Sequence, residues 1–312
     1  MKDTPLISIL IPTYNVAPWI EDAIVSILNQ TYKKIEVIII DDCSKDNTLS
    51  IVSELAGNDD RIKIITNEQN LKIAKTLNRG LVHASGEYIA RFDGDDLAVP
   101  ERLEKQLKYL IDNKLDLIGC QMISIDGKGN TLNKSISPKG EQQVKTVSNY
   151  VSPIAHIWLA KKEVYNKLKG YRDIPYAEDY DFILRAIDCG FKCDNHPDYL
   201  MFIRHREGNS ASVASLIQRK AHNYVIRLHR KRMRYGNDDF DESQIKMLAK
   251  HNIIINKLHN TSSQYLTKAI HEKNTFLKLA YLIITSLTSY YNFQYLYRRV
   301  IVRVIMDSRN DK

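Results

Sequence analysis

Residues 86–96 read GEYIARFDGDD, and in this stretch a short β-rich run ends abruptly at a group of carboxylates. The three acids are Asp93, Asp95 and Asp96, and Gly94 stands where a side chain would otherwise intrude. Carboxylates this close repel one another, so a bound cation would stabilise them. A hard divalent ion such as Mg²⁺ or Mn²⁺ would take two of the oxygens and leave coordination positions for nucleotide phosphates. An acidic turn before a helix is the alternative interpretation.

Three apolar runs precede this stretch, at residues 6–11, 35–40 and 62–65, and a helical pattern follows each of them. The runs are rich in β-branched residues, which is typical of strands buried on both faces of a parallel sheet. Strand and helix alternate four times within about a hundred residues. This order predicts an α/β fold with right-handed βαβ units and a mostly parallel sheet flanked by helices.

Polar clusters follow three of the expected strands, at residues 13–15, 41–42 and 93–96. Ligands bind open α/β sheets beyond the carboxyl ends of the strands, so these clusters are expected to form one site. The sequence has neither a GxGxxG motif after the first strand nor a Walker loop. Phosphate binding is therefore expected to depend on a metal and on isolated cations.

The composition indicates a globular protein with an anionic partner. The chain has 312 residues, 44% of them hydrophobic, and a net charge of +8, which suits one large domain with an appendage. Residues 219–234 are rich in Lys and Arg and contain no acid, a pattern that indicates either an anionic partner or a solvated helix face. The four cysteines show no paired zinc spacing, and no signal-peptide pattern precedes the first strand. We therefore expect a reduced, cytoplasmic protein.

Five blocks of the sequence, in this order, resemble the family 2 glycosyltransferases with the GT-A fold. They lie at residues 8–15, 41–48, 86–96, 100–106 and 170–185. The resemblance extends over residues 5–212 and implies a GT-A catalytic domain at residues 1–212. Its nucleotide-sugar-binding half would be residues 1–120 and its acceptor-binding half residues 121–212. Residues 213–312 would form a helical, basic C-terminal extension.

The resemblance further implies inverting, metal-dependent transfer from a nucleotide-activated donor, usually a UDP-sugar. The residues assigned to the donor are Pro12, Thr13, Tyr14, Asn15, Asp42, Lys72, Arg91, Asp93, Gly94 and Asp95. Asp42 would accept the N3–H of uracil. Asp95 would be the direct metal ligand, with Asp93 near the ribose or the metal. Lys72 could instead be a surface lysine, and the glycine that many relatives carry in this segment is absent.

The same resemblance makes Asp179 the general base. Inversion requires a carboxylate that takes the proton of the acceptor hydroxyl as the new bond forms. Glu178 and Asp179 also begin a helical pattern, where acids can serve as caps instead. We predict that Glu178 and His156 contact the acceptor, although His156 could equally fill a half-buried turn.

Residues 204–210 read RHREGNS and follow a strand expected at residues 199–203. The basic residues and the glycine predict a lid over the diphosphate, with His205 as a further metal ligand, and a solvated basic loop is the alternative. The polar residues 126–152 predict a hairpin followed by an irregular loop. The sequence has no QxxRW block of the processive synthases, so we expect one sugar to be transferred per encounter.

From residue 214 onward the sequence contains helix formers and no strand signals. Residues 276–291 are too short and too polar for a membrane span. Residues 290–306 interleave aromatic and aliphatic side chains with Arg298, Arg299 and Arg303, as a helix in a lipid interface does. A helix packed on the catalytic domain or on a dimer partner is the alternative, so homo-oligomerisation stays open.

The sequence thus predicts an enzyme that moves one sugar from a UDP-hexose or UDP-N-acetylhexosamine to a glycan acceptor, in O-antigen, capsule or exopolysaccharide assembly. The expected acceptor is linked to polyprenyl diphosphate, and the expected location is the anionic inner face of the cytoplasmic membrane. Nucleic acid is not expected as a partner. A non-catalytic sugar-nucleotide-binding or scaffold protein is the main alternative. A nucleotidyltransferase would be expected to carry a glycine-rich phosphate loop, which the sequence lacks.

Overall fold

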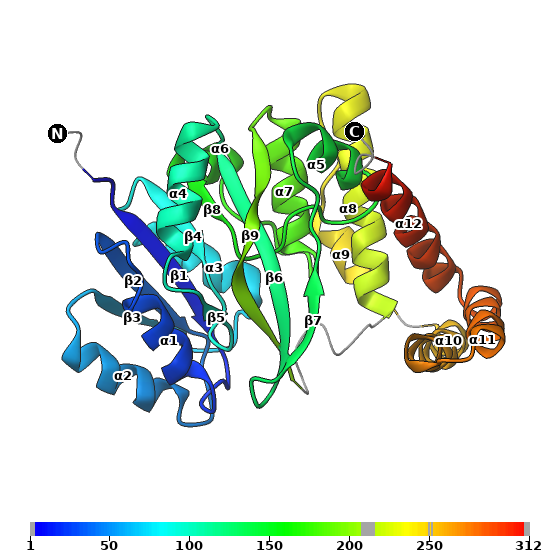
Figure 1. Ribbon diagram of the computed structural model, residues 1–312, viewed down its shortest axis with the longest axis horizontal. Coiled ribbons are helices and arrows are strands. Elements are labelled where there is room, and N and C mark those ends of the chain that lie inside the picture. The colour runs from blue at the N-terminus through cyan, green and yellow to red at the C-terminus, as the bar shows by residue number, and fades with distance from the viewer. Residues whose placement is uncertain (1–3, 207–215, 249, 251, 309–312) are drawn as a thin grey trace.

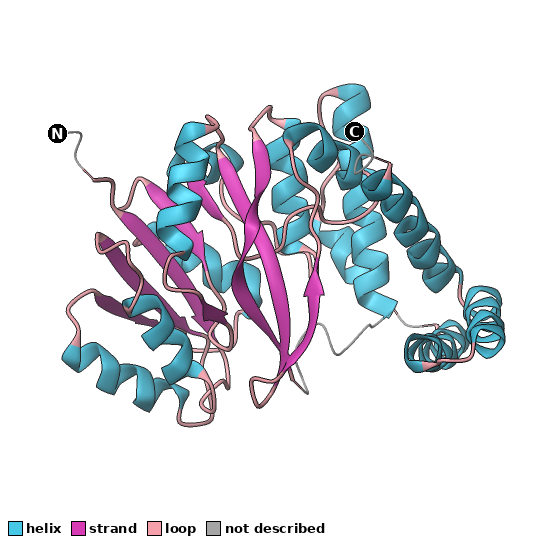
Figure 2. Ribbon diagram, viewed as in Figure 1, coloured by secondary structure: helices cyan, strands magenta, loops and turns pink. Residues whose placement is uncertain are grey.

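A central mixed β-sheet with helices on both sides forms the body of the molecule (Figures 1 and 2). The computed structural model describes residues 4–206, 216–248, 250 and 252–308. Within these residues the sheet has nine strands in the order β3-β2-β1-β4-β8-β6-β9-β5, with β7 paired to β6. The α/β architecture predicted from the sequence is confirmed.

The N-terminal part of the sheet is parallel, as predicted. It consists of β1 (Ile7–Thr13), β2 (Ile35–Asp41), β3 (Ile62–Thr66) and β4 (Tyr88–Arg91). The other strands are β5 (Leu97–Ala98), β6 (Leu117–Asp126), β7 (Thr131–Ser135), β8 (Leu159–Lys161) and β9 (Cys193–His205). Strand β8 runs antiparallel to both β4 and β6, whereas β6 and β9 are parallel. The direction of the strands therefore changes at β8.

Helices cover both faces of the sheet because consecutive residues of each strand point to opposite sides. Ile9 belongs to the core beneath α1 (Ile20–Leu28), α2 (Thr48–Asn58) and α4 (Arg102–Asp112). Its neighbour Leu10 belongs to the core beneath α3 (Lys72–Val82), α6 (Lys162–Leu168) and α7 (Glu178–Asp188). In this second core the ring of Trp158 stacks on that of Phe182 at 5.3 Å between centroids. This packing fixes α7 against the sheet.

Two local predictions need correction. The expected hairpin is present as β6 and β7, but the irregular loop predicted to follow it contains α5 (Glu141–Ser148). Val144 and Val147 are the only aliphatic residues of α5 and both are buried, so the helical signal in this polar segment is weak. Strand β9 begins at Cys193 rather than at residue 199, because buried polar residues interrupt its apolar pattern.

The C-terminal region is helical, as predicted. It contains α8 (Leu216–Tyr235), α9 (Glu242–Leu248), α10 (Ile253–His271), α11 (Thr275–Thr288) and α12 (Tyr290–Asp307). Helix α8 packs on α7, and α12 packs on α5 and α8, so both are attached to the body of the molecule. Helices α10 and α11 pack on each other at the far end from the N-terminal strands (Figure 1). In the part of the chain that the structure describes, no helix has the length and apolar character needed to cross a membrane.

A buried carboxylate joins the first strands of the sheet. Glu36 Oε1 accepts hydrogen bonds from Ser8 Oγ at 2.6 Å and from the backbone N–H of Ser85 at 2.7 Å. Its Oε2 lies 2.7 Å from Lys63 Nζ. Burial alone would raise the pKa of Glu36, but the hydrogen bonds from Lys63, Ser8 and Ser85 outweigh it and lower the pKa to about 2.

We expect Glu36→Gln to lower the free energy of unfolding at pH 7 by about 2–3 kcal/mol, since hydrogen bonds to charged groups contribute about 1.5–3 kcal/mol each. The stabilisation by the carboxylate is fully present above the ordinary pKa of 4.5 and is lost as the pH falls through the folded value of about 2. The difference in the free energy of unfolding between Glu36→Gln and the parent protein should therefore be smaller at pH 3 than at pH 7. Urea unfolding at both pH values measures it, with the exposed Glu54→Gln as control. An equal loss at pH 7 and pH 3 would contradict this account.

Candidate active site

A cavity of about 530 Å³ opens at the carboxyl ends of β1, β2 and β4. Its lining includes Pro12, Thr13, Tyr14, Asn15, Asp42, Lys72, Asp93, Gly94, Asp95, Asp96, His156, Arg204 and Arg206. Of the donor residues predicted from the sequence, only Arg91 is outside this lining. His156, predicted for the acceptor, lies in the same cavity, whereas Glu178, Asp179 and His205 do not line it.

The register of the parallel strands brings the polar clusters together. Thr13 at the end of β1 pairs with Asp41 at the end of β2, and the N–H of Asp42 donates to the carbonyl of Thr13 at 2.8 Å. The turn after β4 lies close beneath, because a Cβ at Gly94 would come within 3.0 Å of Thr13 Cγ2 and 2.9 Å of Ile20 Cδ1. A glycine is therefore required for the carboxylate turn to approach β1 this closely.

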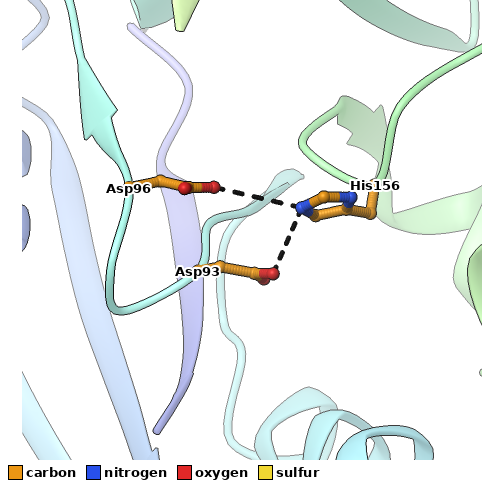
Figure 3. A group of neighbouring side chains, drawn as sticks. All are labelled: Asp93, Asp96 and His156. Atoms are coloured by element: carbon orange, nitrogen blue, oxygen red, sulfur yellow. Dashed lines mark ion pairs between the residues drawn. The ribbon is translucent and has the colours of Figure 1, made fainter. Parts of the chain in front are cut away.

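Three side chains of the cavity form a group that could hold a metal ion (Figure 3). His156 Nε2 lies 3.2 Å from Asp93 Oδ2 and 3.9 Å from Asp96 Oδ2, and one ligand atom from each residue lies within 4.8 Å of the others. Burial and the charges of Asp95 and Asp93 raise the pKa of Asp96 well above its usual range. Burial would lower the pKa of His156, but the charge of Asp93 outweighs it and raises this pKa to about 9.

The residues present fit a divalent cation. Asp93 Oδ1 is buried without a hydrogen bond from any described residue, and its nearest cation is Arg91 Nε at 3.5 Å. Burial and the charges of Asp95 and Asp93 raise the pKa of the neighbouring Asp96, so a cation bound among these carboxylates would relieve their repulsion. Carboxylate oxygens with an imidazole nitrogen suit Mn²⁺, and carboxylate oxygens alone suit Mg²⁺. Asp96 was not predicted as a site residue, although it is the third acid of the opening stretch.

The structure places Asp95 and His205 apart from this group. Asp95 Oδ2 accepts from Arg206 Nε at 2.6 Å, and the Arg206 guanidinium lies 4.9 Å from the ring centre of Trp19. Burial and the charge of Asp93 raise the pKa of Asp95. His205 Nε2 lies 3.1 Å from Ser124 Oγ on β6. Their roles as metal ligands stay predictions.

Arg91 connects the carboxylates to the start of α7. Its guanidinium is buried, lies 3.2 Å from Glu178 Oε1 and pairs with Asp93 on the other side. Burial and the charge of Asp179 raise the pKa of Glu178 to about 7, although Arg91 acts in the opposite direction. Glu178 is thus engaged with Arg91. Asp179 is partly exposed, and its Oδ1 accepts the N–H of Tyr180 at 2.7 Å.

On the side of the cavity predicted to bind the nucleoside, the carboxylate of Asp42 accepts hydrogen bonds from three residues. Its Oδ1 accepts from Asn67 Nδ2 and from the N–H of Leu71, each at 2.7 Å, and its Oδ2 accepts from the N–H of Lys72 at 3.0 Å. Lys72 adopts a φ of 67°, the left-handed conformation that favours glycine. The glycine missing from this segment is therefore replaced by a lysine that keeps the turn and lines the cavity.

The predicted lid is described only in part. The N–H of Arg204 donates to Asp96 Oδ1 at 2.8 Å, and its Nε donates to the carbonyl of Asp95 at 2.8 Å. Arg204 therefore joins β9 to the carboxylate turn. Residues 207–210 of the predicted lid lie outside the described residues.

The fold and the site together define a glycosyltransferase. The chain belongs to glycosyl transferase family 2, whose family model matches residues 8–169. The putative glycosyltransferase EpsE of Bacillus subtilis is 36% identical over 213 residues, which is 65% of this chain and 74% of EpsE.

Solved structures share the GT-A fold of this chain. Residues 1–349 of Staphylococcus aureus TarS, in complex with UDP-GlcNAc, match with a TM-score of 0.62 and 18% identity, over 98% of this chain and 91% of that one. The mannosyltransferase PcManGT of Pyrobaculum calidifontis, in complex with GDP-Man and Mn²⁺, matches with a TM-score of 0.60 and 20% identity, over 100% of this chain and 89% of that one. The predicted family and fold are thus confirmed.

Proposed function

We propose that the protein transfers one sugar, with inversion, from a UDP-hexose or UDP-N-acetylhexosamine to a glycan acceptor. The observation that carries this proposal is the cavity at the carboxyl ends of β1, β2 and β4, which gathers the predicted donor residues around a group of carboxylates. The UDP-GlcNAc bound to TarS supports a UDP-sugar donor, and the GDP-Man bound to PcManGT makes GDP-sugars the donors to test beside it.

In this proposal Asp42 reads the base of the nucleotide. Three hydrogen bonds fix its carboxylate, and only one of them reaches Oδ2, which leaves this oxygen able to accept the N3–H of uracil. The fixed carboxylate needs no reorganisation when the nucleotide binds. Pro12, Thr13 and Tyr14 would frame the nucleoside beside it.

Asp93, Asp95, Asp96 and His156 would hold Mn²⁺ or Mg²⁺ with the donor diphosphate. The ion would supply positive charge against the growing negative charge of the departing nucleotide. Asp93 stays ionised, because the charge of His156 and then the Arg91 guanidinium outweigh burial and hold the pKa of Asp93 below its usual range.

Asp179 would take the proton of the acceptor hydroxyl. Glu178 would not serve as the base in its place, because its carboxylate is paired with Arg91. The hydrogen bond from the N–H of Tyr180 orients one oxygen of Asp179, and the other oxygen has no protein partner among the described residues. Inversion requires one oriented carboxylate that takes the proton of the acceptor hydroxyl.

The proposed setting is the assembly of a bacterial surface polysaccharide on a polyprenyl-diphosphate-linked acceptor, with the protein peripheral at the inner face of the cytoplasmic membrane. Large apolar side chains on the outer surface of α10 and α11 support this setting. Ile253, Phe276 and Leu287 are each more than 80% exposed (82%, 87% and 83%). Large exposed apolar side chains on two helices that pack together favour a lipid or protein contact.

The donor is tested by incubating the purified full chain with UDP- and GDP-sugars, with Mn²⁺ or with EDTA. We expect slow hydrolysis of one UDP-sugar that depends on the metal. Binding of a UDP-sugar with neither hydrolysis nor transfer to any lipid-linked acceptor would favour the scaffold alternative. Failure to bind any sugar nucleotide would overturn both interpretations.

We expect Phe276→Glu combined with Leu287→Glu to reduce sedimentation with phosphatidylglycerol vesicles several-fold, because it removes apolar area and adds negative charge on α11. Both side chains are exposed, so the fold should persist. Deleting the tail is a poorer test, because α12 packs on α5 and α8. Lys139→Gln combined with Lys169→Gln, far from α11 in sequence, changes the net charge by the same amount and controls for charge. Unchanged sedimentation, or a change from dimer to monomer instead, would contradict the membrane contact.

A further inference from the structure

A second cavity, of about 170 Å³, lies between α8, α12 and the loop that follows α5. We call it the arginine pocket. Its charged and aromatic lining consists of Arg219 and His222 on α8, Tyr291, Tyr295, Arg298 and Arg299 on α12, and Tyr150 of the loop. The sequence pattern indicates an anionic partner or a solvated face for residues 219–234 and a lipid interface for Arg298 and Arg299, but it does not predict a pocket between them.

The positive charge of the arginine pocket is not matched by protein carboxylates. Among the described residues no acid forms an ion pair with Arg219, Arg298 or Arg299, and Arg219 Nε is buried without a hydrogen-bond partner. Burial lowers the pKa of Arg219, and the charges of Arg298 and Arg299 lower it further against the influence of Tyr295. Buried charges are normally paired. Arg219, which no described acid pairs, lies beside Arg298 and Arg299 in this pocket, and this arrangement favours an anionic ligand.

Other arginines near this region show what a compensated site looks like. Arg232 on α8 pairs with both Asp188 and Asp238, and Arg172 pairs with the same Asp238 at 2.7 Å. These pairs join α8 to α7 and leave no charge unmatched there. Arg219, Arg298 and Arg299, which all line the arginine pocket, lack such a pair with any described acid.

The start of α7 lies between the arginine pocket and the donor cavity. Glu178 contacts Arg91 on the donor side, and the ring of the next-but-one residue, Tyr180, lies 5.6 Å from that of His222 in the pocket. Asp179 lies between Glu178 and Tyr180 in the sequence. The charge of Asp179 acts on the pKa of His222, against the lowering that burial causes.

The loop after α5 links the same two cavities. Ser152 lines the arginine pocket and His156 lines the donor cavity. Four residues of chain span at most about 14 Å when fully extended, so these two lining positions are close. A molecule of modest length can therefore reach from the pocket to the donor.

We propose that the arginine pocket binds a phosphate or diphosphate group of the acceptor, so that the sugar hydroxyl next to this group lies at Asp179. The inference rests on the proposed function and names the anionic part of the acceptor. Guanidinium groups match phosphate oxygens with paired hydrogen bonds, and the tyrosine hydroxyls can donate to the remaining oxygens. The lipid chain of such an acceptor would leave the pocket toward the helices α10 to α12.

Binding of inorganic pyrophosphate to the full chain, measured by calorimetry in EDTA, tests this proposal. We expect Arg298→Gln and Arg299→Gln to weaken it by about tenfold or more each, since a hydrogen bond between charged groups is worth at least that factor. Arg299 is exposed, so its replacement should not disturb folding. Arg303→Gln, with the same loss of charge on the same helix but outside the pocket, is the matched control and should bind as the parent does. Pyrophosphate that binds in the donor cavity contributes equally to the measurement for the parent protein and for all of these variants.

Two further probes identify the source of the phosphate. Farnesyl diphosphate in detergent micelles should bind more weakly to the pocket variants than to Arg303→Gln, as pyrophosphate does. If sedimentation with phosphatidylglycerol vesicles falls while pyrophosphate and farnesyl diphosphate bind unchanged, the arginines contact lipid headgroups and the proposal is overturned. Equal pyrophosphate affinity in all variants also overturns it. In either case metal-dependent hydrolysis of a UDP-sugar by the parent protein shows separately whether the proposed glycosyl transfer stands.

Discussion

We expect Asp179→Asn to lower the rate of sugar transfer by about two to four orders of magnitude, the range for loss of a general base. The amide keeps the shape of the carboxylate and can still accept the N–H of Tyr180, so α7 should keep its first turn. UDP binding should stay near normal, because Asp179 does not line the donor cavity. Transfer is measured under saturating donor, and UDP affinity by titration of the same preparation.

Asp173→Asn is the control for this variant. Asp173 lies six residues before Asp179 on the same segment, is partly exposed and pairs with Lys75 on the surface. Its replacement should leave transfer unchanged. If Asp179→Asn keeps transfer within a few-fold of the parent protein, Asp179 only caps α7 and the base must be another residue.

Much of the fold follows from local patterns in the sequence. The continuous β-branched runs of β1 and β2 are buried on both faces, and buried strands of a parallel sheet carry this pattern. Because parallel strands end at one edge, the polar clusters after β1, β2 and β4 necessarily meet there. The position of the cavity could thus be predicted from the sequence, and of the predicted donor residues only Arg91 is outside its lining.

The parts of the site that could not be predicted depend on long-range packing. Asp96 joins a metal-binding group only because the loop after α5 brings His156 across to β4, more than fifty positions along the chain. The arginine pocket requires α12 to pack against α8, although about seventy residues separate Arg219 from Tyr295. Neither of these two long-range contacts can be recognised from the local sequence pattern.

Backbone conformation limits prediction in a further way. The sequence around Lys72 lacks the expected glycine, which put the turn and the role of this lysine in doubt. The structure shows that Lys72 takes the left-handed conformation itself, with its N–H bound to Asp42. A non-glycine residue in this conformation stores strain of about 1–3 kcal/mol, which surrounding contacts must offset. Such positions cluster at functional sites, and the same conformation is found at Asn15, which lines the cavity, and at Cys43, which follows Asp42.

We expect Asp95→Ala to abolish the increase in UDP affinity that Mn²⁺ produces. Asp95 lines the donor cavity next to Asp93, where burial and the charge of Asp93 raise its pKa, so a cation bound between the two carboxylates would relieve their repulsion. Metal ligation by this carboxylate would contribute several kcal/mol to charge stabilisation, far more than its ion pair with Arg206. Titration of UDP with Mn²⁺ and with EDTA measures the difference, and binding of Mn²⁺ alone is followed by electron paramagnetic resonance.

Asp112→Ala, on the exposed surface of α4, removes one carboxylate outside the cavity and should keep the full metal effect. The variants then separate two ways of holding the ion. If Asp95→Ala loses the metal effect while UDP still binds weakly in EDTA, the carboxylate predicted from the sequence is a direct ligand, and Arg206 must release it when the donor enters. If Asp95→Ala keeps the metal effect and Asp93→Ala loses it, the ion is held by Asp93, Asp96 and His156 as they stand, and Asp95 serves only to position Arg206.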